Sequence, residues 1–456
     1  MKCEEATVST LSNGGKTWST KLRSIRALVE SKPQTVLNNL GHILDFDFLA
    51  DCFYALDGSK AIGMDDVNKE DYGYELTTNL TELLFRIRRG TYRPQAARIV
   101  KIPKADGGER PLAISCVEDK IVQMAVARTL EQIYEPIFVP GSFGYRPNKS
   151  AHDCIFYLKQ SMESFKLGSL IEIDISKYFN TIPHRDLLEF LQLKIADRRF
   201  LHLIRSLMET ETTENRVTTR NTLGVPQGSI LSPILSNIFL HYVIDDWFRT
   251  IRPQHFKGRA ELYRFADDLC FVFEYSYDAE RFFKVLPLRL QKYGLKLHLE
   301  KSQILPSGWA QMQSLRRRGV RLPTFKFLGF TFYWCLSKKG RMIVKVKARA
   351  DRMRAKLQEI SSYLRRNLHH PNHKEVIRGL ASRVRGWLNY FAVSDNGGIC
   401  WRFVDHVLHR LLRWFNRRGK KGCMSFSKLI SILDKASFPR SWKIKSLYIF
   451  RPKFEP

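Results

Sequence analysis

The chain of 456 residues is long enough for roughly two to four domains, and its 44% of hydrophobic residues can bury a large core. Its formal net charge of +30 favours a polyanionic partner. No apolar run approaches the ~20 residues that span a bilayer, and Met1–Thr17 is too polar for a signal peptide. These features exclude a membrane protein and predict a cytoplasmic one.

The N-terminal part of the chain is predicted to be helical and then to form a basic hairpin. Leu22, Ile25 and Leu28 follow helical spacing within the first 60 residues. Farther along, the Gly-rich turn Asp106–Gly108 divides the basic segment Arg98–Leu112, so that its two halves can fold back towards one anion. A basic hairpin without a ligand is the alternative at this point.

The segment Leu170–Phe179 (LIEIDISKYF) is predicted to be a strand with one apolar face. Ile171, Ile173 and Ile175 alternate with polar residues, which is the period-2 pattern of a half-buried strand. Asp174 therefore lies at the far end of this strand. Taken alone, such a carboxylate can simply be solvated.

The most informative segment is Tyr263–Phe273 (YRFADDLCFVF), in which Asp267 and Asp268 interrupt an apolar and aromatic run. The pattern predicts a strand, a tight turn and a second strand. Two adjacent buried carboxylates are costly unless a cation neutralises them, and Mg²⁺ is typically held by one or two carboxylates plus substrate phosphates. Together with Asp174, the pair predicts a phosphoryl-transfer metal site; a surface hairpin with an acidic turn is the alternative.

The C-terminal quarter of the chain is strongly basic and predicted to be helical. From Lys345 to Pro456 there are 26 Lys and Arg against 7 Asp and Glu. The difference is nearly two-thirds of the net positive charge of the whole chain. Ala348–Leu368 and Val404–Arg418 have apolar residues at helical spacing, with cations and aromatic rings between them. This mixture suits RNA, because cations contact phosphate and rings stack on unpaired bases. Packing of the rings in a helical core is the alternative, and we expect it first for Trp387 and Tyr390.

The order of these motifs resembles that of reverse transcriptases, most closely the proteins encoded by group II introns. Seven blocks carry the resemblance in order: Arg98–Leu112, Gly141–Asp153, Leu170–Leu187, Gly224–Phe239 (GVPQGSILSPILSNIF), Arg264–Asp268, Gly294–Ile304 and Phe325–Phe332. Beyond them, Ile377–Phe391 (IRGLASRVRGWLNYF) resembles the signature of the maturase, or thumb, domain.

The resemblance implies an α+β fold, a right-hand polymerase with fingers, palm and a helical thumb. The domains would be an N-terminal extension over 1–60, fingers and palm over 61–335, a thumb or maturase domain over 345–418 and a possible short DNA-binding tail over 419–456. The eight cysteines contain no C-x-x-C pair, so we expect a variant without the HNH endonuclease domain of many relatives.

Catalytic and nucleotide-binding roles follow from the resemblance residue by residue. Asp174 and Asp267 would ligate two Mg²⁺ ions with support from Asp268. The residues implied to lie around the incoming dNTP are Lys104 and Arg110 on the triphosphate, Phe179 as the gate against a 2′-hydroxyl, Gln227 and Gly228 beside the nucleotide, and Lys301 near the departing pyrophosphate. Arg385, Arg413, Arg417 and Arg418 are the predicted nucleic-acid contacts in the thumb.

Two positions depart from the family pattern. Phe265 stands where the catalytic box usually begins with Tyr, which keeps the ring and loses the hydroxyl. Asp66 replaces the second Gly of a G-x-D-G stretch, and Asp adopts positive φ more readily than most residues. Neither change touches the three carboxylates, so we expect an active polymerase.

Three functions remain open on the sequence. The first is an RNA-directed DNA polymerase and maturase that binds group II intron RNA, assists its splicing and copies it from a DNA primer. The second is a related enzyme that serves phage defence or CRISPR spacer acquisition. The third is an RNA-binding splicing factor whose polymerase site is inactive. The intact carboxylates favour the first two, and the maturase signature favours the first. No feature predicts an oligomeric state.

Overall fold

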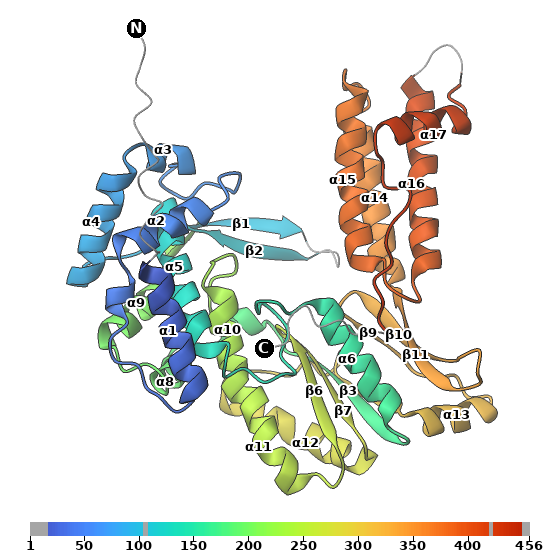
Figure 1. Cartoon of the computed structure of the whole chain (residues 1–456), viewed down its shortest axis with the longest axis horizontal. Coiled ribbons are helices and arrows are strands. Elements are labelled where there is room, and N and C mark those ends of the chain that lie inside the picture. The colour runs from blue at the N-terminus through green and yellow to red at the C-terminus, as the bar shows by residue number, and fades with distance from the viewer. Residues whose placement is uncertain (1–16, 104–107, 419–422, 449–456) are drawn as a thin grey trace.

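The computed structural model describes residues 17–103, 108–418 and 423–448. Figure 1 shows three parts: helices with a projecting hairpin at one end, a central sheet with its helices, and a helical bundle at the other end. The structure combines helices with three mainly antiparallel sheets, so the expected α+β class is confirmed. None of the described helices is long and apolar enough to cross a membrane.

The first part combines the N-terminal helices with the fingers. Its helices are α1 (Thr17–Ser31), α2 (Phe46–Ala55), α3 (Lys69–Tyr74), α4 (Leu76–Arg89), α5 (Val117–Tyr134), α8 (His184–Gln192) and α9 (Arg198–Met208). Its sheet has the order β2-β1-β4-β5, with β1 (Ala97–Pro103), β2 (Glu109–Ile114), β4 (Thr212–Glu214) and β5 (Val217–Thr219). The β1–β2 hairpin is the basic hairpin predicted from the sequence.

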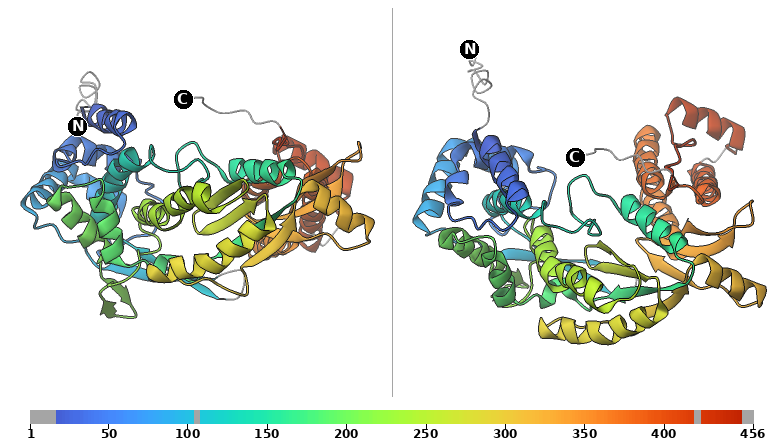
Figure 2. Two further views of the ribbon diagram at one scale, coloured as in Figure 1. Left: turned by 90° about the horizontal axis from the view of Figure 1, so that it is seen from below. Right: turned by 60° about the horizontal axis from the view of Figure 1, so that its bottom comes forward.

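The palm is a four-stranded antiparallel sheet with helices on both faces. Its strand order is β6-β7-β3-β8, with β3 (Gly168–Asp174), β6 (Ala260–Phe265), β7 (Asp268–Phe273) and β8 (Gln303–Ser307). Figure 2 shows α6 (Ala151–Ser164) and α12 (Ser276–Lys292) on opposite faces of this sheet. Three further helical segments connect it to the fingers: α7 (Tyr178–Thr181), α10 (Ser232–Leu240) and α11 (Asp246–His255).

Alternating residues of the palm strands enter two separate hydrophobic cores. Ile171 and Ile173 of β3 join the core shared with the fingers, whereas Leu170 joins a second core. The alternation predicted for Ile171 and Ile173 is present, but the opposite face of the sheet, which the pattern predicts to be polar, also packs on a core through Leu170. Because the sheet is buried on both faces, packing against the two cores fixes its position.

The second core continues from the palm into the thumb. Between them lies a three-stranded sheet, β11-β10-β9, formed by β9 (Thr324–Phe327), β10 (Phe330–Leu336) and β11 (Met342–Ala348), with α13 (Trp309–Arg317) beside it. The thumb helices are α14 (Ala350–Arg366), α15 (His373–Phe391), α16 (Gly397–Arg418) and α17 (Phe426–Lys435). Trp387 is buried and stacks on Phe403 with 4.0 Å between ring centroids, which confirms its predicted place in the core.

Candidate active site

The three predicted catalytic carboxylates meet at one end of the palm sheet. Strands β3 and β7 are antiparallel, and their register sets Asp174 directly opposite Asp268. Asp267 lies in the two-residue turn between β6 and β7, next to Ala266 at φ 57°. The predicted strand, turn and strand are therefore present, and the two carboxylate-bearing segments lie side by side.

A buried ion pair holds this hairpin from behind. The Arg264 side chain is fully buried, and its guanidinium donates to both carboxylate oxygens of Asp245 at 2.8 and 2.6 Å. It also donates to the Asn237 side-chain oxygen at 2.9 Å and to the Ala266 carbonyl at 3.2 Å. Because Ala266 immediately precedes Asp267, this network fixes the turn that presents the carboxylate.

Two glycines allow a neighbouring segment to approach the same hairpin. The segment around Ser142 runs beside β6, with hydrogen bonds of 2.8 Å in both directions between Arg264 and residues Gly141 and Phe143. A Cβ on Gly141 would lie 2.1 Å from the Leu262 carbonyl oxygen, and one on Gly144 would lie 2.2 Å from the Ala266 nitrogen. Only glycine fits this backbone-to-backbone packing.

Enclosure and the negative charge of their neighbours raise the pKa of two of these carboxyl groups, Asp267 and Asp268. Solvent reaches Asp268 through the cleft, but protein surrounds it elsewhere; this enclosure, followed by the charges of Asp267 and Asp174, raises its pKa to about 7. Burial, with a further contribution from Asp174, also raises the pKa of Asp267. A bound cation would relieve both effects, because it favours the charged forms.

The donor set fits Mg²⁺ in chemistry, although it does not form a complete cage. Within the described ranges, no group of three or more His, Cys, Asp and Glu residues is arranged closely enough to enclose an ion. Mg²⁺ is usually held by one or two carboxylates, with phosphate and water oxygens completing its shell. Asp174, Asp267 and Asp268 supply hard oxygen ligands of this kind beside an open cleft. They are the residues that would hold the ion.

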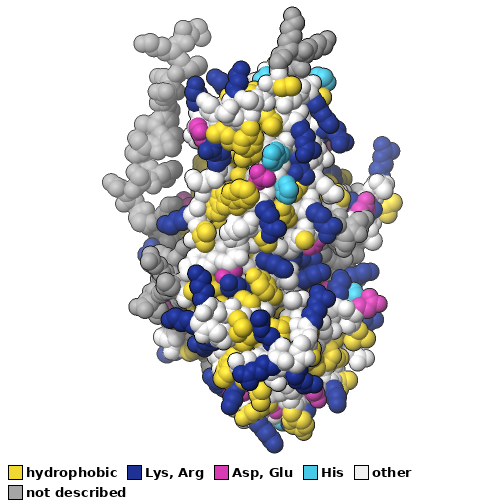
Figure 3. All heavy atoms as spheres, turned by 90° about the vertical axis from the view of Figure 1, so that its right-hand side faces the viewer, with side chains coloured by type: hydrophobic (Ala, Val, Ile, Leu, Met, Phe, Trp, Pro, Cys, Tyr) yellow, Lys and Arg dark blue, Asp and Glu magenta, His cyan; other side chains and the backbone are white. Residues whose placement is uncertain are grey.

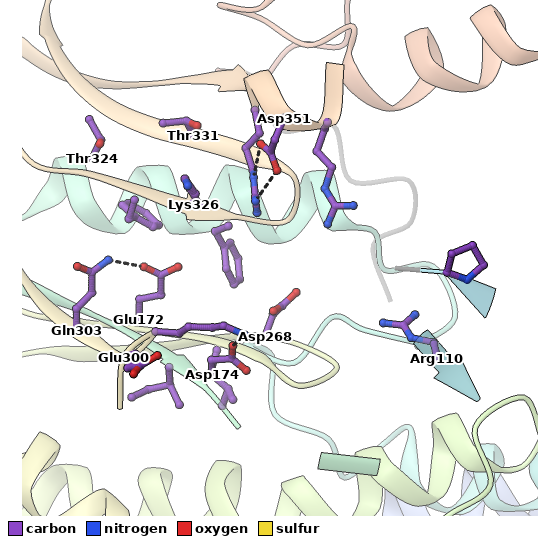
Figure 4. A pocket seen from close by; sticks show the side chains of 18 of the residues that line it. Arg110, Glu172, Asp174, Asp268, Glu300, Gln303, Thr324, Lys326, Thr331 and Asp351 are labelled. Carbon is purple, nitrogen blue, oxygen red and sulfur yellow. Dashed lines mark hydrogen bonds and ion pairs between the residues drawn. The ribbon is translucent and has the colours of Figure 1, made fainter. Parts of the chain in front are cut away.

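The cleft above the carboxylates has a volume of about 1010 Å³ and is lined by the fingers, the palm and the first turn of the thumb. Figure 4 shows Asp174 and Asp268 on its lower wall, Lys326 and Asp351 on its upper wall, and Arg110 approaching from β2. Arg110 is close enough to Asp267 to favour that residue's charged form. Lys104 lies outside the described residues.

The predicted nucleotide-binding residues of the palm lie around the same point. The ring of Phe179 is half-buried against Tyr178, and its carbonyl accepts from Val225 N at 2.8 Å. Gln227 joins palm to fingers: its carbonyl accepts from Ala113 N at 2.7 Å, and its amide donates to the Asn180 side-chain oxygen at 3.0 Å.

Gly228 and Lys301 complete this group. Gly228 has φ 108°, and a Cβ there would lie 2.7 Å from the Ala113 carbonyl oxygen, so the contact with the fingers requires glycine. Lys301 places its Nζ 3.4 Å from an Asp174 carboxylate oxygen.

Several residues of the site escape prediction from the sequence. Arg349 and Arg352, from the start of α14, line the cleft together with Lys326. Tyr145 has φ 55°, and enclosure raises the pKa of its hydroxyl with a further contribution from Asp267. Tyr145 and Lys326 lie inside two of the blocks that carry the family resemblance, but no local pattern singles out any of these residues. Arg264 does carry a signal, because a charge inside a buried strand requires a partner.

The predicted thumb arginines do not form one group. Arg413 and Arg417 are exposed one turn apart near the end of α16, where the helix packs beside His373. Arg385 is exposed on α15, 12 residues beyond His373, and donates to the Ser437 carbonyl at 3.4 Å. The side chain of Arg418 lies outside the described part of the chain. Figure 3 views the molecule from the end that carries the thumb, and Lys and Arg greatly outnumber acidic side chains there.

Comparisons with known proteins agree with this geometry. Residues 102–332, half of the chain, match the family model for reverse transcriptase (RNA-dependent DNA polymerase). Residues 350–428 match the group II intron, maturase-specific domain. The second match begins at α14 and extends into α17, so it covers most of the thumb as the structure shows it.

Curated relatives match over the central part of the chain. Protein YkfC of Escherichia coli is 34% identical over 206 residues, covering 44% of this chain and 53% of that protein. Group II intron-encoded protein LtrA of Lactococcus lactis is 34% identical over 189 residues, covering 41% of this chain and 31% of that protein. The putative COX1/OXI3 intron 2 protein of Saccharomyces cerevisiae is 36% identical over 184 residues, covering 40% and 20%.

The matched segment thus spans about half of one relative and a third or less of the other two. The family model nevertheless covers part of the fingers, the whole palm sheet and every predicted catalytic carboxylate. The chain belongs to the reverse transcriptase family, and it carries a group II intron maturase-specific domain.

Proposed function

We propose that this protein is an RNA-directed DNA polymerase that binds group II intron RNA, assists its splicing and copies it into cDNA. The observation that carries the proposal is the convergence of Asp174, Asp267 and Asp268 at the end of the palm sheet, beside a cleft that the maturase-specific region also lines. A decayed polymerase would have no need of three carboxylates held against their own repulsion.

The residues divide the work of nucleotide addition. Arg110 grips the triphosphate from the fingers, since its guanidinium can bind phosphate oxygens in pairs. Phe179 closes the side of the pocket where a 2′-hydroxyl would lie, and Gln227 anchors the fingers to that pocket. Two Mg²⁺ ions, when bound by the carboxylates, would activate the primer hydroxyl and stabilise the leaving oxygen. Lys301, beside Asp174, supplies a positive charge at the same place.

The test is extension of a DNA primer on an RNA template with and without Mg²⁺. Asp267→Asn should abolish synthesis while leaving binding of the RNA within about twofold, because the substitution removes a charge and changes little of the shape. Asp246→Asn is the matched control, since Asp246 lies in the palm but forms an exposed pair with Arg249. Synthesis retained by Asp267→Asn would refute the metal assignment.

The maturase role needs its own measurement. Splicing of the transcript that flanks the coding sequence should accelerate when the protein is added at low Mg²⁺. Wild-type protein that binds this RNA and promotes splicing but makes no DNA would indicate an RNA-binding splicing factor instead. Protein that makes DNA but ignores the transcript would indicate a polymerase in another role, such as phage defence.

A further inference from the structure

The turn between α15 and α16, residues 392–396, is the place where palm, thumb and C-terminal segment meet. Asp395 stands in this turn at φ 70°, a conformation that Asp tolerates better than most residues. Its side chain points away from solvent and is only 6% exposed. The buried partners of this carboxylate come from outside the thumb helices.

Asp395 pairs with a buried lysine of the palm. Nζ of Lys159, on α6, lies 3.3 Å from an Asp395 carboxylate oxygen, and the Lys159 side chain is 2% exposed. Nζ of Lys345, on β11, lies 3.9 Å from the other oxygen. A buried ammonium is strongly unfavourable without its counter-charge, so this contact ties α6 to the thumb turn.

The C-terminal segment completes the same cluster. The Tyr448 hydroxyl donates to Asp395 at 2.6 Å, and Lys159 lies 4.1 Å from the centre of the Tyr448 ring. The backbone of this segment pairs with the turn: Ser394 N donates to the Lys445 carbonyl at 2.9 Å, and Lys445 N donates to the Ala392 carbonyl at 2.8 Å. Part of the region predicted as a tail is therefore built into the palm–thumb junction.

The junction is connected directly to the wall of the active-site cleft. The Asn396 side-chain oxygen accepts from Ala348 N at 2.9 Å, two residues before α14 begins. The first turn of α14 carries Arg352, which lines the cleft next to Asp351 on the upper wall (Figure 4). A change in the direction of the thumb at residues 392–396 would therefore move α14 and the part of the cleft wall that it forms.

From these contacts we infer that Asp395 is a positioning residue for the primer–template duplex. Its pairing with Lys159 and Tyr448 holds the thumb against α6 at the angle that lets both walls of the cleft grip the duplex. The inference rests on the proposed polymerase function for its substrate. The coupling of palm to thumb does not depend on that function.

The primary test is Asp395→Asn, which keeps the size and the tolerance for positive φ but removes the charge. We expect the KM for primer–template to rise about tenfold and the product length per binding event to fall, while kcat stays within twofold. Tyr448→Phe, which removes the hydroxyl and keeps the ring beside Lys159, should raise KM two- to threefold. Asp434→Asn is the matched control, because Asp434 forms an exposed pair with Arg440 in the same region; it should change neither constant.

A double variant separates positioning from simple loss of stability. Lys159→Met with Asp395→Asn removes the buried charge as well as its partner, so the melting temperature should return towards the wild-type value. The KM for primer–template should stay raised, because the directional contacts are still missing. Recovery of KM together with the melting temperature would overturn the inference and leave the pair a purely structural role.

A distance measurement tests the coupling of palm to thumb through Asp395 and does not require polymerase activity. Spin labels at two exposed positions, Leu288 on α12 and Trp401 on α16, report palm and thumb in a background in which Cys3, Cys335 and Cys423 are replaced by Ser. The wild-type pair should give one narrow distance distribution, which Asp395→Asn broadens and Asp434→Asn leaves unchanged. An unbroadened distribution would refute the inference. The wild type could make no DNA while Asp395→Asn still broadens the distribution. In that case the proposed function fails and the palm–thumb coupling stands.

Discussion

Arg264 and Asp245 form a fully buried ion pair directly behind the hairpin that presents Asp267. Their side chains come from β6 and from the short helical segment His241–Asp245 between α10 and α11, so the pair joins the active-site turn to the core of the palm. Buried pairs of this kind do not by themselves add much stability, but they fix one arrangement of the groups around them. Here the arrangement includes the Ala266 carbonyl, one residue before the carboxylate.

Asp245→Asn should therefore destabilise the protein strongly. The substitution leaves the Arg264 guanidinium buried without its counter-charge, which costs about 3–5 kcal/mol in the free energy of unfolding. Urea unfolding measures this loss, with Asp246→Asn as the control because the neighbouring carboxylate is exposed. A loss below about 1 kcal/mol, within the range of exposed pairs, would show that the pair does not hold the hairpin.

Gly144→Ala should move the hairpin itself. The new Cβ would lie 2.2 Å from the Ala266 nitrogen, so the turn must shift, at a cost of about 1–3 kcal/mol and with loss of most DNA synthesis. Gly386→Ala is the control: nothing lies within 4 Å of a Cβ at this exposed position of α15, and the change should stabilise the helix by about 0.5–1 kcal/mol. Unimpaired synthesis by Gly144→Ala would mean that the turn tolerates displacement.

The parts of the site that the sequence predicts are those encoded within one strand or one turn. Alternation along Ile171–Ile175 and the interruption at Asp267 both depend on residues a few positions apart, and both predictions are confirmed in the structure. The pairing of β3 with β7, which brings Asp174 opposite Asp268, is encoded by no periodicity and comes from the structure.

The parts that sequence reasoning missed depend on contacts between distant segments. Lys159 and Asp395 are 236 positions apart, and nothing near either residue indicates the other. Arg352 is one of many cations in a basic helix, and only its place in the wall of the cleft distinguishes it. A charged residue in an apolar run, such as Arg264, shows that a partner exists without showing which residue it is.

Phe179→Ala should weaken discrimination against ribonucleotides. The ring is half-buried, and the backbone of Phe179 is bound to Val225, two residues before Gln227. Removal of the ring should open the pocket where a 2′-hydroxyl would lie. Incorporation of rNTP relative to dNTP should rise on the order of tenfold, the effect of changing one apolar contact in a pocket. Phe179→Tyr keeps the ring and should keep the selectivity. If the wild type, Phe179→Ala and Phe179→Tyr all select equally against ribonucleotides, Phe179 is not the gate.

Asp119 should make the stability of the fingers depend on pH. This carboxyl is 1% exposed and accepts hydrogen bonds from the Tyr92 hydroxyl and from Gln95 N, and burial raises its pKa to about 7. An unfolded chain ionises the same group near pH 3.9. Between these values the folded state holds a proton that the unfolded state has lost, so stability falls as pH rises from about 4 to 7.

The measurement is the difference in free energy of unfolding between wild type and Asp119→Asn at pH 5 and pH 8. Because Asn does not titrate, the difference should shift in favour of the variant as pH rises, by at most ~1.4 kcal/mol per pH unit. Contributions from other titrating groups cancel in the comparison. A constant difference across this range would mean that Asp119 is ionised in the folded protein at pH 5.

The end of α16 should contribute to RNA binding through phosphate contacts. Arg413 and Arg417 are exposed on one side of the helix, and among the described residues neither takes part in an ion pair. Each phosphate contact contributes ~0.7–0.9 to the slope of log affinity against log salt concentration. Replacing both arginines with Gln should therefore flatten that slope by about 1.5. Replacing Arg198 and Arg199 with Gln should leave the slope unchanged. These two exposed arginines belong to α9, on the far side of the molecule (Figure 1). If the α9 variant flattens the slope and the α16 variant does not, the RNA lies along the fingers.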